Sequence, residues 1–278
     1  MKQIEVKKII NPISTSDGAG VKLKRSIGLE PNYFDPFLML DEFGSKNKDD
    51  YIAGFPPHPH RGIETVTYML AGDFEHKDST GGQGKMTAGD VQWMKTGSGI
   101  IHSEMPAMKE GKLHGFQLWV NMPAKLKMSK PEYLYINANK IAVHKDVGKS
   151  VKVIAGKYEQ AEGPIKGHNV EPIYFDVELK KSKEFNFNLP STHNSLIYLI
   201  DGEIKIGNKT HDKVNGATLF ILANGEILNI KGVTNSKFLL ISGKPIGEPI
   251  ARGGPFVMNT KEEILKAIQD YHSGNFIK

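Results

Sequence analysis

Short runs of alternating hydrophobic and polar residues recur along most of the chain, and glycine or proline separates many of them. Alternation with a period of two is typical of β-strands that bury one face. Many short strands spaced in this way indicate an all-β sandwich or barrel rather than alternating strands and helices. The clearest runs are residues 64–70, 116–121, 173–179, 195–200 and 237–241.

One helix is expected near the end of the chain. Thr260 and Glu263 fit a Thr-x-x-Glu capping box, Asn259 is an alternative cap, and Gly274 supplies a stop. Apolar residues recur at helical spacing between these signals, so the helix is expected to close a barrel or to pack at a domain junction. The apolar residues are Ile264, Ala267, Ile268 and Tyr271.

The two halves of the chain repeat a similar pattern. In the first half a strand ends at residues 70–73, a hairpin follows, and a glycine turn at 88–91 leads into another strand. Residues 199–202 and 214–218 hold the same places in the second half. Such repetition indicates an internal duplication. We therefore predict two domains, 1–135 and 136–278, the second of which carries the terminal helix.

Composition and charge exclude several kinds of site. The 278 residues include no cysteine, which rules out disulfides, thiolate zinc sites, iron–sulfur clusters and a cysteine nucleophile. The net charge of +5 comes from scattered lysines, so we expect no direct contact with nucleic acid. No apolar run is long enough for a signal peptide or a membrane span, so we expect a cytoplasmic protein without a membrane partner.

Two short segments carry the candidate chemistry. His58 and His60 lie in a proline-rich segment, and His102 and Glu104 follow a pair of glycines. Alternate side chains of an extended segment point to the same face, so each pair projects together. If the two segments are neighbours in a barrel, three imidazoles and a carboxylate converge on its interior. These donors suit a borderline divalent metal such as Fe(II), Mn, Ni, Cu or Zn.

Spacing leaves one ligand undecided. Glu64 follows His60 by four positions and is also a candidate, but five protein ligands would leave little room for a substrate. Either Glu64 or Glu104 is therefore expected to lie outside the ligand set and to support it. In the second half, His193 matches the first histidine pair and lacks a partner, so that half is expected to bind no metal.

The remaining histidines receive no metal role. His76 and five others are expected to be exposed or hydrogen-bonded, and His114 is a weak candidate because its strand follows His102 closely. The glycine-rich segments 81–85 and 97–99 lack the spacing of a phosphate-binding loop, and no nucleophile elbow occurs.

At these residues the chain resembles the pirin family of two-domain cupins. The resemblance covers nearly the whole chain and is weakest between about 125 and 235. It rests on residues 37–43 (FLMLDEF), 57–68 (PHPHRGIETVTY), 89–94 (GDVQWM), 99–104 (GIIHSE), 117–121 (QLWVN), 243–250 (GKPIGEPI) and 254–259 (GPFVMN).

The resemblance implies an all-β bicupin, with two tandem β-barrel or jelly-roll domains and a C-terminal helix. It places a metal-binding cupin in residues 1–135 and a metal-free cupin in 136–278. It also implies an iron ion in the first domain, with Glu64 outside the ligand set. The residues at the matching ligand positions are His58, His60, His102 and Glu104.

Two kinds of function follow from the resemblance. Some family members are described as quercetin 2,3-dioxygenases, and others as iron-dependent partners of transcription regulators or metabolic enzymes. Our leading hypothesis is a monomeric Fe(II) dioxygenase that opens a flavonol ring with O₂, with Glu104 as the base for the 3-hydroxyl proton. Phe55, Trp93 and Met94 are candidates for an apolar pocket that holds the planar aromatic substrate.

The rival hypothesis is an iron-binding regulatory protein whose metal controls docking to a protein partner. A metal-dependent sugar isomerase is a weaker alternative, because no further cluster of polar ligands is evident. An enzyme needs a pocket open to the metal, whereas a binding protein does not.

Overall fold

The computed structural model describes residues 2–28, 34–108, 110–212 and 218–277. The chain forms two compact units, and each is discontinuous in sequence. The first unit comprises Ile13–Ala138 and Ile246–Lys278, and the second comprises Met1–Pro12 and Asn139–Pro245. No helix among the described residues is long and apolar enough to cross a membrane.

The first unit contains two antiparallel sheets. The larger sheet has the order β12 (Glu132–Ile136), β9 (Val91–Lys95), β6 (Ile63–Ala71), β11 (Leu113–Asn121), β4 (Phe37–Ser45), β3 (Val21–Ile27) and β2 (Ile13–Asp17). The smaller sheet has the order β5 (Phe55–His60), β10 (Ile100–Pro106), β7 (Phe74–Asp78) and β8 (Gln83–Met86). Short 3-10 helices lie at η1 (Lys48–Asp50) and η2 (Ala124–Leu126). Buried residues from both sheets form a shared core, which includes Phe43, Met69, Phe74 and Met86.

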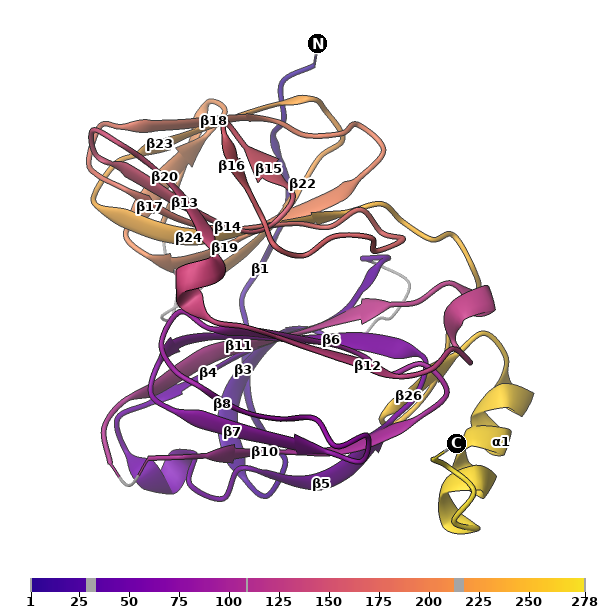
Figure 1. Cartoon of the computed structure of the whole chain (residues 1–278). Helices are drawn as coiled ribbons and strands as arrows, with labels where there is room; N and C mark the ends of the chain where they lie inside the picture. Colours follow the sequence, from indigo (N-terminus) through magenta and orange to yellow (C-terminus); the bar gives the residue numbers. More distant parts are fainter. Residues whose placement is uncertain (1, 29–33, 109, 213–217, 278) are drawn as a thin grey trace. The chain divides into compact units, whose positions relative to one another are not determined.

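The C-terminal segment packs on this first unit. It contains a hairpin of β25 (Ala251–Gly253) and β26 (Phe256–Met258), followed by α1 (Lys261–His272) (Figure 1). The expected capping box is present, because the Thr260 side chain accepts from the Glu263 backbone and the Glu263 side chain accepts from the Thr260 backbone. Arg61, which follows the second histidine of β5, donates to the Asp270 carboxylate over 2.9 Å.

This ion pair explains which face of α1 is buried. Ile264 and Ala267 are buried as the helical spacing suggests, but Ile268 and Tyr271 are 36% and 38% exposed. Asp270 is buried instead, because its carboxylate lies against the guanidinium of Arg61. A buried charge is tolerated when it is paired in this way.

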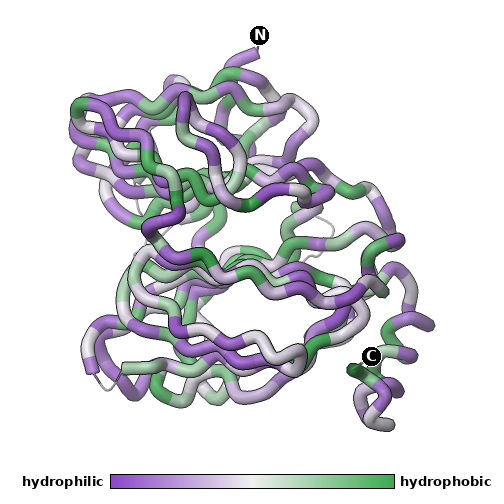
Figure 2. Tube along the Cα trace, viewed as in Figure 1, coloured by the Kyte–Doolittle hydropathy of each residue, from purple (hydrophilic) through white to green (hydrophobic). Residues whose placement is uncertain are grey.

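The second unit has the same two-sheet plan. Its larger sheet has the order β1 (Val6–Ile10), β22 (Thr218–Leu222), β19 (Asn194–Asp201), β24 (Ser236–Gly243), β17 (Ile173–Leu179), β14 (Lys149–Ala155) and β13 (Ala142–Asp146). The smaller sheet has the order β18 (Glu184–Asn188), β23 (Ile227–Gly232), β20 (Glu203–Ile206) and β21 (Lys209–Asp212). A short hairpin of β15 (Lys157–Tyr158) and β16 (Ala161–Glu162) and the 3-10 helix η3 (Ala138–Lys140) complete the elements. Hydrophobic residues recur along the strands of both units (Figure 2).

The two strand orders match strand for strand, as expected for an internal duplication. Each unit has one sheet of seven strands and one of four, and the central strands of the large sheets, β11 and β24, hold equivalent places. In the first unit β12 is the edge strand next to β9. In the second unit β1 is the edge strand next to β22, so β1 and β12 hold equivalent places.

The ends of the chain differ from the predicted domains 1–135 and 136–278. The internal change from one unit to the other falls after Ala138, close to the predicted position. However, the first twelve residues belong with the second unit and the C-terminal segment belongs with the first. The physical reason is edge pairing. β1 pairs with the edge that β22 would otherwise leave open, while β26 and α1 contact Arg61, the residue that follows β5.

Candidate metal centre

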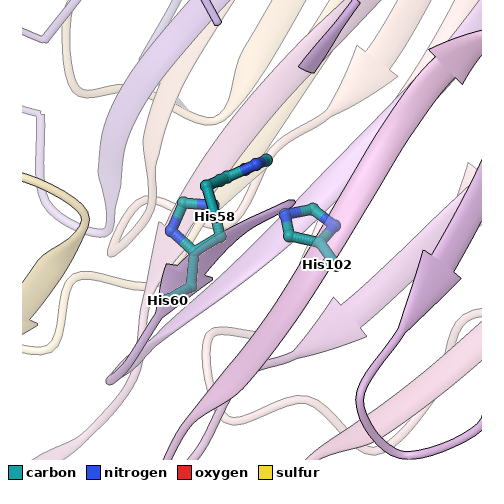
Figure 3. Close-up of side chains that lie close together, drawn as sticks. All are labelled: His58, His60 and His102. Carbon is teal, nitrogen blue, oxygen red and sulfur yellow. The ribbon is translucent and has the colours of Figure 1, made fainter. Parts of the chain in front are cut away.

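Two neighbouring strands of the small sheet carry the histidine pairs. β5 and β10 are antiparallel, and His58 lies directly opposite His102 in their register. The three imidazoles of His58, His60 and His102 converge (Figure 3), and each offers a ligand atom within 4.8 Å of the other two. The structure thus brings together the two segments that the sequence could only suggest were neighbours.

Backbone carbonyls orient two of these rings. His58 Nδ1 lies 2.8 Å from the carbonyl oxygen of Pro56, and His60 Nδ1 lies 3.2 Å from that of Pro255. A carbonyl can only accept, so each Nδ1 carries the proton and each Nε2 keeps a lone pair for a metal. The carbonyl of Pro255 comes from the C-terminal segment, which therefore helps to position a ligand.

Burial keeps the three histidines neutral. Burial and the charge of His58 lower the pKa of His60 to about 3, and burial lowers the pKa of His102 well below its usual range. The pKa of His58 is also lowered, mainly by burial. Because a metal binds the neutral imidazole, these rings need not lose a proton near neutral pH before they coordinate.

Glu104 lies on the same strand as His102 but faces a polar network. Its Oε1 accepts from Thr67 Oγ1 at 2.9 Å and from Gln92 Nε2. Burial raises the pKa of Glu104 to about 7, even though both hydrogen bonds favour the ionised form. A register shift between His102 and Glu104 interrupts the pairing with β5, so Glu104 is paired with Phe55.

A fifth side chain, His76, joins this region from β7. His76 is 1% exposed and lies directly opposite Glu104 in the register of β7 and β10. Its ligand atom lies within 4.8 Å of those of His102 and Glu104, so the donors form two groups that share His102. The sequence predicts that His76 is exposed or hydrogen-bonded and has no metal role. The only sequence signal for it was the His-x-Asp spacing of His76 and Asp78 in a predicted hairpin.

The other candidates lie elsewhere. Glu64 is buried and its Oε2 accepts from the indole nitrogen of Trp93 at 2.6 Å, and neither ligand group among the described residues includes it. His114 donates to the Glu42 carboxylate over 2.8 Å and is also outside both groups.

A mainly apolar cavity of about 550 Å³ reaches the ligand groups, and Asp17, Asp41 and Arg252 add charged groups to its wall. His58, His60 and Glu104 form part of its wall. The expected pocket residue Phe55 lines it, but Trp93 and Met94 do not, which corrects that prediction. Neighbouring residues of a strand point to opposite faces, so Trp93 turns away from the side on which Gln92 contacts Glu104. The large apolar residues of the wall are Leu23, Met39, Phe43, Phe55, Phe74 and Trp119.

The second unit fills the equivalent place with hydrophobic side chains. By strand order β18 and β23 correspond to β5 and β10. Their register pairs Phe185 with Ile230 and Phe187 with Leu228, and these residues pack in the core of that unit. His193 is therefore the wrong counterpart for the histidine pair: it lies just before β19, where its Nδ1 is 3.2 Å from Ser242 Oγ. A separate cavity of about 450 Å³ in this unit is lined by lysines and acids.

The residues of the first unit fit a metal ion. Both ring nitrogens of His102 are buried and have no hydrogen-bond partner among the described residues, which is costly unless something else binds them. Three neutral nitrogen donors and a nearby carboxylate are the donor set of a borderline divalent transition metal.

Comparisons with known proteins cover both units. A family model described as Pirin matches residues 20–120, and one described as Pirin C-terminal cupin domain matches 174–277. A pirin-like protein of Caulobacter vibrioides is 45% identical, over 98% of each chain. Pirin of Homo sapiens is 39% identical, over 93% of this chain and 89% of that protein. The crystal structure of quercetin 2,3-dioxygenase from Acinetobacter baumannii is similar with a TM-score of 0.90 and 32% identity, over 99% of each chain.

Proposed function

Because the chain belongs to the pirin family of two-domain cupins, we propose that it is a metal-dependent dioxygenase that opens a flavonol ring with O₂. The substrate class is a small planar aromatic such as quercetin. The proposed resident metal is Fe(II), and its proposed ligands are His58, His60, His102 and Glu104. When bound, a divalent metal supplies a Lewis acid that polarises a substrate oxygen.

The observation that carries this proposal is the cavity that reaches the ligand groups. A binding protein does not need an apolar chamber beside its metal, whereas a dioxygenase with an aromatic substrate does. Phe43 and Phe74 stack with ring centroids 5.6 Å apart, and Phe55 meets Phe74 edge-on at 6.3 Å. Phe55 is partly exposed and offers flat apolar surface to a planar substrate, while Phe43 and Phe74, each 2% exposed, support it from the core. The similarity to a quercetin 2,3-dioxygenase over the whole chain supports the same substrate class.

Glu104 is the proposed base for the 3-hydroxyl proton of the substrate. A pKa of about 7 is suited to accepting a proton near neutral pH. The hydrogen bonds from Thr67 and Gln92 both go to Oε1, so they fix the carboxylate while Oε2 accepts none of the hydrogen bonds described. Oε2 is therefore the oxygen that we assign to the substrate or the metal.

The test is turnover by protein of known metal content. Apo-protein loaded anaerobically with Fe(II) should bleach the flavonol absorbance of quercetin and consume O₂ when air is admitted. The matched control is His114→Gln, which changes a histidine of the same unit outside both ligand groups and should keep the activity. If metal-replete protein turns over no faster than free Fe(II), the dioxygenase proposal is wrong for this substrate. The iron-binding regulatory protein then becomes the better hypothesis.

A further inference from the structure

His76 is built like a metal ligand, although the proposed function does not use it. Its Nε2 lies 2.9 Å from Asp78 Oδ2, and its ring stacks on Tyr133 with centroids 4.2 Å apart and planes within 7°. Asp78 is fixed in turn, because its Oδ1 accepts from the backbone and hydroxyl of Thr80 and from the backbone of Gly82. The ring is therefore held in one orientation by strong contacts on its edge and its face.

This arrangement determines which nitrogen of His76 is available. A carboxylate accepts, so Nε2 carries the proton and Nδ1 keeps its lone pair. Nδ1 is buried and has no hydrogen-bond partner among the described residues. A carboxylate that orients a histidine in this way is a common support for a metal ligand. A buried lone pair without a partner is otherwise unfavourable.

His102 shows the complementary feature. A metal-bound histidine usually donates its second ring nitrogen to a carbonyl or carboxylate, as His58 and His60 do here. Neither nitrogen of His102 has such a partner in the described part of the chain. His102 is also the residue that the two ligand groups share. Each of its nitrogens can therefore serve a different ion once the proton that one of them carries in the neutral ring is released to solvent.

We propose that His76, His102 and Glu104 form an inner seat for a second divalent transition-metal ion. The outer seat is formed by His58, His60 and His102. Binding of the second ion displaces the ring proton of His102 to solvent, and the resulting imidazolate bridges the two ions. Glu104 has two carboxylate oxygens and can serve either seat, so the proposal is compatible with its role in the proposed function. The two seats lie close together, and the repulsion between two dications makes the second ion bind more weakly than the first.

Two negative groups partly offset that repulsion. The Glu104 carboxylate is a member of the inner group, and the Asp78 carboxylate lies directly behind His76. The outer group contains no carboxylate. The inner seat is therefore the more negative of the two, which favours a dication there even when the outer seat is filled.

The experiment counts metal ions rather than turnover. The apo-protein is dialysed against increasing Co(II), and bound cobalt per chain is measured by elemental analysis. Wild-type protein should reach two ions per chain, the second with the weaker affinity. His76→Gln should bind one ion with unchanged first affinity, while the matched control His114→Gln should still reach two. His60→Ala weakens the outer seat and should keep an ion in the inner one.

A second variant guards against a folding defect in His76→Gln. In Asp78→Asn the amide can donate to Nε2, which moves the ring proton to Nδ1 and removes the inner lone pair without changing His76. This variant should also bind only one ion. In the Cu(II) form, a bridging imidazolate couples the two spins, so the wild-type EPR signal should be weaker than its copper content requires.

Three outcomes overturn the inner seat. Wild-type protein could saturate at one ion, His76→Gln and Asp78→Asn could both retain two, or they could lose the first ion together with the second. These results are distinguishable from a failure of the proposed function. Two ions without quercetin turnover contradict only the dioxygenase, and turnover with a single ion contradicts only the inner seat.

Discussion

His102 lies directly opposite His58 across the antiparallel pair of β5 and β10, with ring centroids 4.3 Å apart. This cross-strand pair is what joins two sequence segments into one site, since each segment alone offers only two donors. A shift of the register by one residue would turn the side chains of one strand to the opposite face. The positions of the two strands therefore decide whether the donors form a centre.

His102→Ala is the most damaging single change expected for metal binding. His102 belongs to both ligand groups, so its loss leaves no group of three among those described. We expect bound metal to fall from stoichiometric to trace, measured by elemental analysis after dialysis. The β-fold should persist by circular dichroism because Phe43, Phe74 and their neighbours form the core. His193→Ala, in the other unit, is the control and should keep its metal; stoichiometric metal in His102→Ala would refute the assignment.

Glu104→Gln separates catalysis from metal binding. The glutamine keeps the shape of the side chain but cannot accept the substrate proton, and the loss of a general base typically costs about 10²- to 10⁴-fold in rate. The histidine group should retain at least part of the metal affinity. Quercetin turnover per bound Fe(II) should therefore fall by at least about a hundredfold. A variant that keeps its turnover per iron would show that Glu104 is not the base.

Metal binding should be coupled to the proton on Glu104. With a pKa of about 7 in the metal-free protein, Glu104 is mostly protonated below pH 7, so a metal that binds its carboxylate must displace a proton. The apparent affinity should fall by up to about tenfold per pH unit between pH 7 and pH 5. His60, with a pKa of about 3, adds nothing in this range.

Calorimetry in buffers of different ionisation enthalpy measures the released proton directly. On binding the first ion at pH 6, wild-type protein should release about one proton per chain, and Glu104→Gln should release none. The contribution of Glu104 to the stability of the metal-free protein falls with rising pH, whereas the metal affinity rises. Because folding raises the pKa of Glu104 from 4.5 to about 7, its contribution to the stability of the metal-free protein is full below pH 4.5. That contribution is lost as the pH rises through 7.

Ile4→Ala should destabilise the second unit and spare the first. Ile4 is 2% exposed, packs in the core of the second unit and donates its backbone N–H to Ile227 over 2.9 Å. Removal of a buried isoleucine side chain costs about 2–5 kcal/mol. Hydrogen exchange should accelerate in β22 and β23 but not in β5 and β10. Equal acceleration in β5 and β10 would contradict the assignment of the first twelve residues to the second unit.

Much of this molecule could be predicted from local patterns. Period-two alternation identifies strands because side chains of a strand point alternately to its two faces, and this holds wherever the strand lies. The same rule places His58 with His60, and His102 with Glu104, on common faces. The capping box at Thr260 can also be predicted from the sequence, because it involves residues only three positions apart. The duplication was visible because corresponding turns recur in both halves.

The features that require strands from distant parts of the sequence to pair could be determined only from the tertiary structure. Nothing in the sequence around His76 shows that β7 pairs with β10, which places His76 opposite Glu104. Edge pairing also put β1 on β22, although little of β1 is buried and its pattern is weak. The sequence by itself determined which residue types could bind a metal and which face of each strand they share. Only the packing of strands from distant parts of the chain determined which of them meet, because that register depends on non-local contacts.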